Sequence, residues 1–222
     1  MRETGTLSRV SDLYVPRIVD GLLDELLVSF PAVSLVGPRA AGKTTTAVRR
    51  GGTVLRLDRP EVRQSVAASP DAMLAGLHPP VILDEWQEVP ELLGAVKRSV
   101  DSDPTPGRYI LTGSVRAELE NQIWPGTGRL LQVPMYGMSV REVMRRAGMV
   151  PFIDRVIASG PDAVTAPDEA LGIRDYLDLM LAGSFPEPSL RIPVAARRRW
   201  FAGYVEQMIT RDVPAEIGRA HV

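Results

Sequence analysis

Residues Gly37–Thr44 read Gly-Pro-Arg-Ala-Ala-Gly-Lys-Thr, a match to the pattern G-x-x-x-x-G-K-[ST]. The match follows the apolar run 32–36 and precedes a plausible helix, which is the strand–loop–helix setting that this pattern needs. In such a loop, backbone N–H groups form a cradle for an anion. The alternative is a glycine-rich turn with a chance Lys-Thr. The pattern predicts a site for nucleotide phosphates, and we call 37–44 the phosphate loop.

The motif assigns roles to individual residues. Lys43 is expected to reach the β- and γ-phosphates and so to act in catalysis, and the Thr44 hydroxyl is expected to ligate Mg²⁺. The residues expected to contact the nucleotide are Gly37, Pro38, Arg39, Ala40, Ala41, Gly42, Lys43, Thr44 and Thr45.

An acidic pair follows a second apolar run. Val81-Ile82-Leu83 is typical of a buried central strand, and Asp84-Glu85 comes directly after it. Parallel sheets bind ligands at the carboxyl ends of their strands, so Asp84 is expected to hold the magnesium shell. Glu85 is expected to act as the general base that orients and polarises the attacking water. A solvated turn is the alternative for an acidic pair alone, and the upstream phosphate loop favours the catalytic interpretation.

Two more residues are catalytic candidates. The hydroxyl residues of Thr112-Gly113-Ser114 follow a strand-like run, where they are expected to lie beside the γ-phosphate, and Ser114 is the catalytic candidate among them; ordinary turn chemistry explains the same residues. Arg129 opens the strand-like run 130–133, and an arginine there can neutralise charge in the transition state. A surface arginine is the alternative, and the sequence does not say whether Arg129 serves its own subunit or a neighbour.

Strand-like and helical segments alternate along the first part of the chain. This order predicts an α/β fold of three layers, a P-loop NTPase with a parallel five-stranded sheet. The expected strands are 32–36, 54–57, 81–83, 109–111 and 130–133. The expected helices are 17–30, one opening at Pro60, 70–77 and 91–100.

After Pro134 helical segments dominate, at 139–147, 152–158, 168–182 and 194–212. Ser139 and Glu142 have the spacing of a capping box at the start of the first of these. The pattern predicts an ATPase core over 1–134 and a small helical appendage over 135–215.

Composition narrows the function classes. Among 222 residues there is no cysteine, which excludes disulfides, thiol catalysis and cysteine-bound zinc. The net charge of −1 gives no overall attraction to nucleic acid, although a local contact through Arg197–Arg199 stays open beside a solvated helix face. No apolar stretch is long enough to span a membrane, and the first residues lack a secretory core. These features predict a cytoplasmic protein without membrane contact.

In this order the motifs resemble a family of prokaryotic AAA-like P-loop ATPases that join an AAA-type core to a C-terminal domain of unknown function. The matching segments are Gly37–Thr44, Leu57-Asp58, Leu83–Gln87, Leu111–Ser114, Gly128-Arg129, Pro134 with Ser139 and Glu142, Ala182–Glu187 and Arg211–Val213. In Ala182–Glu187, Ser184 replaces the second glycine of the family turn.

The resemblance implies ATP rather than GTP, in agreement with the absence of an Asn-Lys-x-Asp motif. The expected function is Mg²⁺-dependent hydrolysis of ATP that switches an attached module. The alternative is a nucleotide-gated interaction module with negligible turnover, and a small-molecule phosphotransferase ranks third. A DNA or protein partner, bound through a further C-terminal region, and a homo-oligomer are both left open.

Family members continue beyond the point that corresponds to Val213. The residues Glu216–Val222 can be back-translated into a sequence that contains a common sequencing adapter. We therefore expect 216–222 to be an artefactual tail and the natural protein to be longer; a natural short tail is the alternative.

Overall fold

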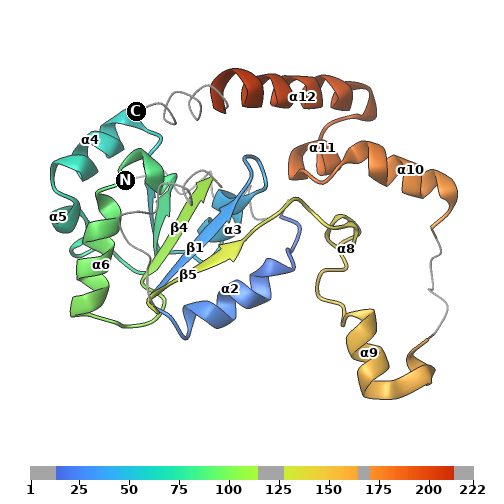
Figure 1. The fold of residues 1–222 in the computed structure, drawn as a ribbon, viewed down its shortest axis with the longest axis horizontal. Coiled ribbons are helices and arrows are strands. Elements are labelled where there is room, and N and C mark those ends of the chain that lie inside the picture. Colours follow the sequence, from blue (N-terminus) through green and yellow to red (C-terminus); the bar gives the residue numbers. More distant parts are fainter. Residues whose placement is uncertain (1–13, 115–127, 165–170, 213–222) are drawn as a thin grey trace, which may run out of the picture. The chain divides into compact units, whose positions relative to one another are not determined.

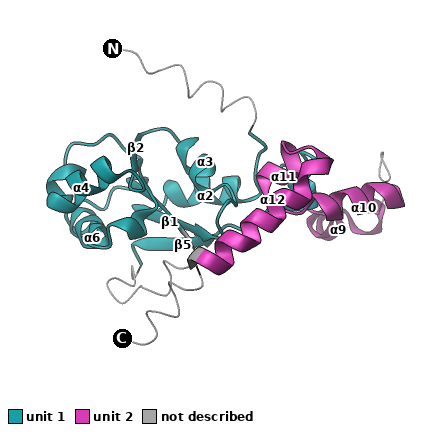
Figure 2. Ribbon diagram, turned by 90° about the horizontal axis from the view of Figure 1, so that it is seen from above, with its two compact units in different colours: residues 1–148 teal, residues 149–222 magenta. Residues whose placement is uncertain are grey.

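A computed structural model of the chain describes residues 14–114, 128–164 and 171–212 (Figure 1). The chain divides into two compact units, residues 1–148 and 149–222, which are coloured separately in Figure 2. The sheet belongs to the first unit, and the second is helical in its described residues. We call them unit 1 and unit 2 and describe each by itself.

Unit 1 is built on a five-stranded sheet with the order β2-β3-β4-β1-β5, in which all neighbours are parallel. The strands are β1 (Ala32–Gly37), β2 (Thr53–Arg56), β3 (Val81–Asp84), β4 (Tyr109–Ser114) and β5 (Leu130–Pro134). The predicted parallel five-stranded sheet is confirmed, and each expected strand is present within a few residues.

Both faces of the sheet are covered, which makes three layers (Figure 1). Strand side chains alternate between the two faces: Val81 and Leu83 of β3 join one buried cluster, and Ile82 joins the other. The first cluster includes residues of α4 (Pro60–Ala68), α5 (Pro70–Leu74) and α6 (Leu92–Ser102), and the second includes residues of α2 (Val19–Leu27) and α3 (Lys43–Val48). Burial on both faces explains why the strands read as continuous apolar runs.

Local sequence features explain where several helices of unit 1 begin and end. Pro60 and Pro70 occupy the first positions of α4 and α5, where a missing N–H costs nothing. The predicted capping box of Ser139 and Glu142 is present at α8 (Val140–Val143). This helix is shorter than the expected 139–147, because Arg145 adopts a positive φ of 57° that no helix continues. A 3₁₀ turn, η1 (Trp86–Glu88), follows β3.

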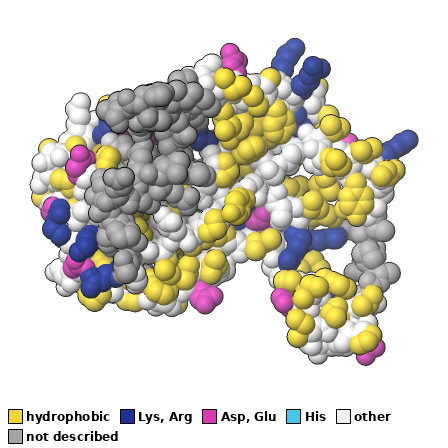
Figure 3. Space-filling model, in the orientation of Figure 1, with side chains coloured by type: hydrophobic (Ala, Val, Ile, Leu, Met, Phe, Trp, Pro, Cys, Tyr) yellow, Lys and Arg dark blue, Asp and Glu magenta, His cyan; other side chains and the backbone are white. Residues whose placement is uncertain are grey.

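Unit 2 contains α9 (Phe152–Ser159), η2 (Gly160–Ala163), α10 (Ile173–Ala182), α11 (Pro186–Leu190), α12 (Val194–Gln207) and the π-helical turn η3 (Met208–Asp212). The short helix α11 was not expected from the sequence, and residues 168–170 of the expected helix 168–182 lie outside the described residues. Phe185 packs against Trp200 and Tyr204 of α12. Most of the large apolar side chains of α9 and α10 are exposed, and yellow side chains gather there in Figure 3.

Residues 135–148, which the sequence analysis assigned to the appendage, lie in unit 1 in the structure. Glu142 in this segment forms a buried ion pair with Arg17, so the segment is tied to the residues that precede α2. The domain boundary expected between residues 134 and 135 stays a prediction. In the described part of the chain, no helix is long and apolar enough to cross a membrane.

Candidate functional site

The phosphate loop connects β1 to α3 and depends on its two glycines. A Cβ at Gly37 would overlap the carbonyl oxygen of Met135, which follows β5. Gly42 has a φ of 99°, in the left-handed region where side chains are strained. The spacing of the motif therefore reflects one close backbone approach at the start of the loop and one positive φ before α3.

Lys43 is buried at the end of this loop. Its ammonium donates to the carbonyl oxygens of Gly37 and Pro38, each at 2.9 Å, so its side chain links the end of the loop to its start. Burial lowers the pKa of Lys43 below its ordinary value, and the carboxylate of Glu85 opposes this shift. The lysine is held where its charge can act on an anion in the loop.

The carboxylate of Asp84 lies at the carboxyl end of β3, beside the phosphate loop. Its Oδ1 accepts hydrogen bonds from the hydroxyls of Thr44 and Thr112, both at 2.6 Å. Asp84 and Thr112 are partners in the register of β3 and β4, which explains the second bond. A carboxylate and a hydroxyl beside an anion cradle form the hard oxygen donor set that suits Mg²⁺.

Glu85 follows in a left-handed conformation, with φ 56° and ψ 49°. This conformation is uncommon for a residue with a side chain, and it turns the chain sharply at the end of β3. The Glu85 amide donates to Thr112 Oγ1 at 3.4 Å. Glu85 is half-buried and acts electrostatically on Lys43, so both charges belong to one site.

The side chain of Gln87 is bound to Glu85. Its amide nitrogen donates to Glu85 Oε2, while its Oε1 is buried without a hydrogen-bond partner among the described residues. The indole nitrogen of the preceding Trp86 is also buried without a hydrogen-bond partner among the described residues. Gln87 therefore holds the Glu85 carboxylate from one side.

The structure brings together Lys43, Thr44, Asp84 and Glu85, pairs Ser114 with Gly37 in the register of β4 and β1, and leaves Arg129 apart. Ser114 ends β4, but its side chain lies outside the described residues. Arg129 precedes β5 and forms an exposed ion pair with Asp101, at the amino-terminal edge of the sheet. The five residues of β5 separate it from the loop edge by about 17 Å, at 3.3 Å per residue. A role for Arg129 in a neighbouring subunit stays a prediction.

The remaining predicted contact residues lie along the loop, apart from Thr45, which lies in α3. Ala41 is buried, Pro38 is half-buried, and the side chains of Arg39, Ala40 and Thr45 are exposed. Contacts between these residues and a nucleotide stay predictions.

Two polar residues at the site, Arg17 and Glu142, were not predicted to lie there, and the bond of Thr112 to Asp84 was not predicted either. The sequence placed Thr112 near the γ-phosphate, but the strand order that puts it beside Asp84 is not visible in the sequence. Arg17 donates to the carbonyl of Ala41 in the phosphate loop at 2.8 Å, and Glu142 pairs with that arginine. The capping-box spacing marked Glu142, but nothing in the sequence linked it to Arg17.

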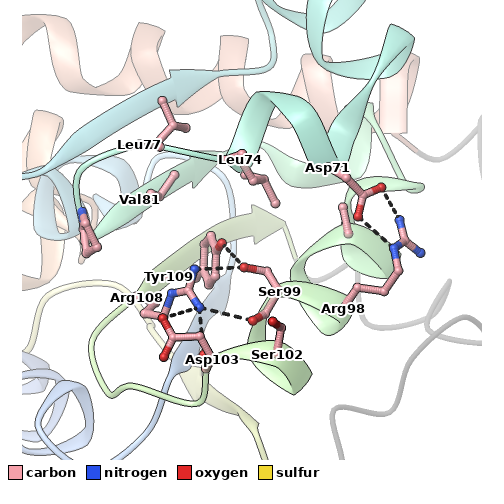
Figure 4. A pocket seen from close by; sticks show the side chains of 14 residues that line it. Asp71, Leu74, Leu77, Val81, Arg98, Ser99, Ser102, Asp103, Arg108 and Tyr109 are labelled. Atoms are coloured by element: carbon pink, nitrogen blue, oxygen red, sulfur yellow. Dashed lines mark hydrogen bonds and ion pairs between the residues drawn. The ribbon is translucent and has the colours of Figure 1, made fainter.

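A cavity of about 360 Å³ opens at the opposite end of the strands (Figure 4). It lies where β3 and β4 begin, between α5 and α6, with Leu74, Leu77 and Val81 in its lining. Two ion pairs, Arg98–Asp71 and Arg108–Asp103, balance the charge around it. This cavity is separate from the phosphate loop.

Comparison with known proteins agrees with this geometry. A protein-family model described as an AAA domain matches residues 29–144. The uncharacterized proteins Mb2031c of Mycobacterium bovis and Rv2008c of Mycobacterium tuberculosis are each 31% identical over 178 residues, covering 76% of this chain. The aligned part is 39% of the length of each relative, so the chain spans well under half of the curated relatives it matches.

The family match includes β1, the phosphate loop, the acidic pair at the end of β3 and α8. Membership of such a family points to nucleotide binding. The chain belongs to the AAA-domain family, that is, to the AAA-like P-loop ATPases.

Proposed function

We propose that this chain binds ATP with Mg²⁺ and hydrolyses the bond between its β- and γ-phosphates, and that hydrolysis switches an attached module. The observation that carries the proposal is the convergence of Lys43 and Thr44 with the acidic pair at the end of β3. Each side chain has the chemistry that one part of phosphoryl transfer to water requires.

Binding is the role of the phosphate loop and Lys43. The backbone N–H groups of the loop and the ammonium of Lys43 supply donors and positive charge for the terminal phosphates. Thr44 and Asp84 would hold Mg²⁺, because their oxygen atoms already meet at one point. When bound, Mg²⁺ neutralises charge on the β- and γ-phosphate oxygens.

The chemical step is assigned to Glu85. A water oxygen bonds to the γ-phosphorus while the bond to the bridging oxygen breaks, and a proton of that water passes to the Glu85 carboxylate. The hydrogen bond from Gln87 to Oε2 leaves Oε1 of Glu85 to accept that proton. Asp84 is assigned to Mg²⁺ instead, because its carboxylate meets the Thr44 hydroxyl.

The experiment measures ATP binding and phosphate release in four forms of the chain. Lys43→Ala is expected to abolish nucleotide binding. Glu85→Gln is expected to keep binding and to lower turnover by about 10²–10⁴, the scale of general-base catalysis. Glu88→Gln is the matched control, because Glu88 is exposed and pairs with Arg63 outside the site. Undiminished turnover in Glu85→Gln would remove the assigned base.

A nucleotide-gated interaction module with negligible turnover is the second candidate. The observation that favours it is the hydrogen bond from Gln87, which occupies part of the carboxylate that should act as base. Tight ATP binding without phosphate release by the wild-type chain supports this candidate. In that case Gln87→Ala is expected to raise phosphate release, because it frees the second oxygen of Glu85.

A further inference from the structure

Arg17 is a buried arginine whose guanidinium contacts three segments of unit 1. Its Nη1 donates to the carbonyl of Ala41 in the phosphate loop at 2.8 Å. Its Nη2 donates to the carbonyl of Tyr136 at 2.9 Å, and its Nε donates to Glu142 at 2.9 Å. One side chain therefore ties the loop to the segment that follows β5 and to α8.

Glu142 fixes this arginine in place. Its Oε1 also accepts from the Ile18 amide at 2.7 Å, and its Oε2 accepts from the Ser139 amide at 2.6 Å. Burial alone would raise the pKa of Glu142, but the two amides and Arg17 outweigh it, and the pKa lies below the ordinary value. The carboxylate therefore stays charged and holds the guanidinium in a single orientation.

The bond to Ala41 sets the direction of a loop amide. A trans peptide is planar, with its C=O and N–H on opposite sides, and the Ala41–Gly42 bond is trans. Holding the Ala41 oxygen toward Arg17 therefore turns the Gly42 N–H to the other side of the loop. Gly42 itself does little to fix the orientation of this peptide, because glycine can adopt many backbone conformations besides the positive φ seen here.

We propose that Arg17 is a positioning residue for the phosphate loop, which it holds from behind so that the Gly42 N–H faces the phosphates of a bound nucleotide. Glu142 keeps Arg17 in this position. The proposal rests on the proposed nucleotide binding and adds to it two residues, one before β1 and one after β5. The ligand class is a polyphosphate, since the positioned group is a donor to phosphate oxygens.

An arginine is required because its planar fork reaches three acceptors at once. A lysine at position 17 retains the charge but has a single nitrogen, which cannot bond Ala41, Tyr136 and Glu142 together in this arrangement. Arg17→Lys therefore tests positioning more directly than Arg17→Ala, which also leaves the Glu142 charge buried without a partner.

Arg108 offers a matched control at the opposite end of the strands. It also donates to two backbone carbonyls, of Ser99 and Asp103, and pairs with the Asp103 carboxylate (Figure 4). Arg108→Lys thus removes a comparable set of bonds from the same unit without touching the phosphate loop. The thermal unfolding midpoint of both variants measures the general structural cost.

The experiment measures the affinity of the wild-type chain, Arg17→Lys and Arg108→Lys for Mg-ATP and for tripolyphosphate, which lacks the nucleoside. We expect Arg17→Lys to weaken both by about tenfold or more, the scale of a hydrogen bond to a charged group. We expect Arg108→Lys to leave both affinities unchanged. Hydrogen exchange of the loop amides should rise in Arg17→Lys and stay the same in Arg108→Lys.

Glu142→Gln provides a second variant if Arg17→Lys fails to fold. It keeps the shape of the side chain, removes the charge, and is expected to weaken both ligands in the same direction. If the wild-type chain binds Mg-ATP and the folded variants bind both ligands with unchanged affinity, the positioning role is wrong. The proposed function is not affected by that result. Absence of Mg-ATP binding in the wild-type chain overturns the proposed function, and the positioning role fails with it.

Discussion

Thr44 donates a hydrogen bond of 2.6 Å to Asp84, although the two residues are forty positions apart in the sequence. One ends the phosphate loop at the start of α3, and the other is the last residue of β3. Because β1 and β3 are parallel members of one sheet, their carboxyl ends lie at the same edge. This pair is where we place Mg²⁺.

The Thr44–Asp84 pair predicts that loss of the Thr44 hydroxyl weakens the effect of Mg²⁺ on nucleotide binding. Thr44→Val removes the hydroxyl and keeps the shape, so we expect Mg²⁺-dependent nucleotide affinity to fall while affinity without Mg²⁺ changes little. Thr44→Ser restores the hydroxyl and is expected to recover the Mg²⁺ effect. Titration of ATP with and without Mg²⁺ measures both. Equal losses with and without Mg²⁺ would contradict the assignment.

The lowered pKa of Lys43 predicts weaker nucleotide binding at alkaline pH. Burial favours the neutral amine, so its proton is lost below the ordinary value of 10.5. A bound polyphosphate favours the charged amine, and ATP affinity should therefore fall as pH rises, by at most about tenfold per pH unit. Lys43→Arg keeps its charge over this range and should show a flatter dependence, measured by calorimetry without Mg²⁺. Identical slopes in both proteins would refute the role of the ammonium.

The close approach of Met135 to Gly37 predicts that adding a single methyl group at Gly37 destabilises the chain strongly. Gly37→Ala forces a Cβ against the Met135 carbonyl, and we expect the free energy of unfolding to fall by about 1–3 kcal/mol or more. Gly21 in α2 is the matched control, because a Cβ there meets nothing within 4 Å. Gly21→Ala should stabilise the chain by about 0.5–1 kcal/mol. Urea unfolding of the two variants measures the contrast.

The buried Arg17–Glu142 pair predicts acid sensitivity. The Glu142 carboxyl titrates near 4.5 when unfolded and lower when folded, so the unfolded chain binds more protons between these values. Stability therefore rises with pH there: this contribution is fully present above about 4.5 and is lost as pH falls through the folded pKa.

Glu142→Gln is accordingly expected to destabilise the chain by about 3 kcal/mol at neutral pH, the scale of a broken buried pair. Its free energy of unfolding should also fall less steeply than that of the wild type as pH drops below about 4.5. Glu88→Gln, which removes an exposed pair with Arg63, should change the neutral stability by about 1 kcal/mol at most. Denaturant unfolding at several pH values tests the slope, and parallel pH profiles for wild type and Glu142→Gln would contradict the prediction.

Local signals in the sequence predicted most of the elements and the four residues that meet at the candidate site. Lys43 and Thr44 belong to one contiguous motif, and Asp84-Glu85 directly follows a buried strand, so spacing and apolar runs identified all four. The capping box of Ser139 and Glu142 was visible for the same reason, since its two partners are three residues apart. The short helix α11 was missed because its five residues carry too weak a pattern.

The sequence by itself determined the parallel α/β sheet and predicted the phosphate loop on it, because these features depend on residues that are neighbours along the chain. Only the tertiary structure decided that Thr112 shares Asp84 with Thr44, that Arg129 lies at the far end of β5, and that Arg17 pairs with Glu142. Arg17 and Glu142 are 125 positions apart. Their meeting depends on the strand order β2-β3-β4-β1-β5 and on exclusion of water from the packed segments. No local periodicity encodes either condition, because both arise only when distant segments are packed together.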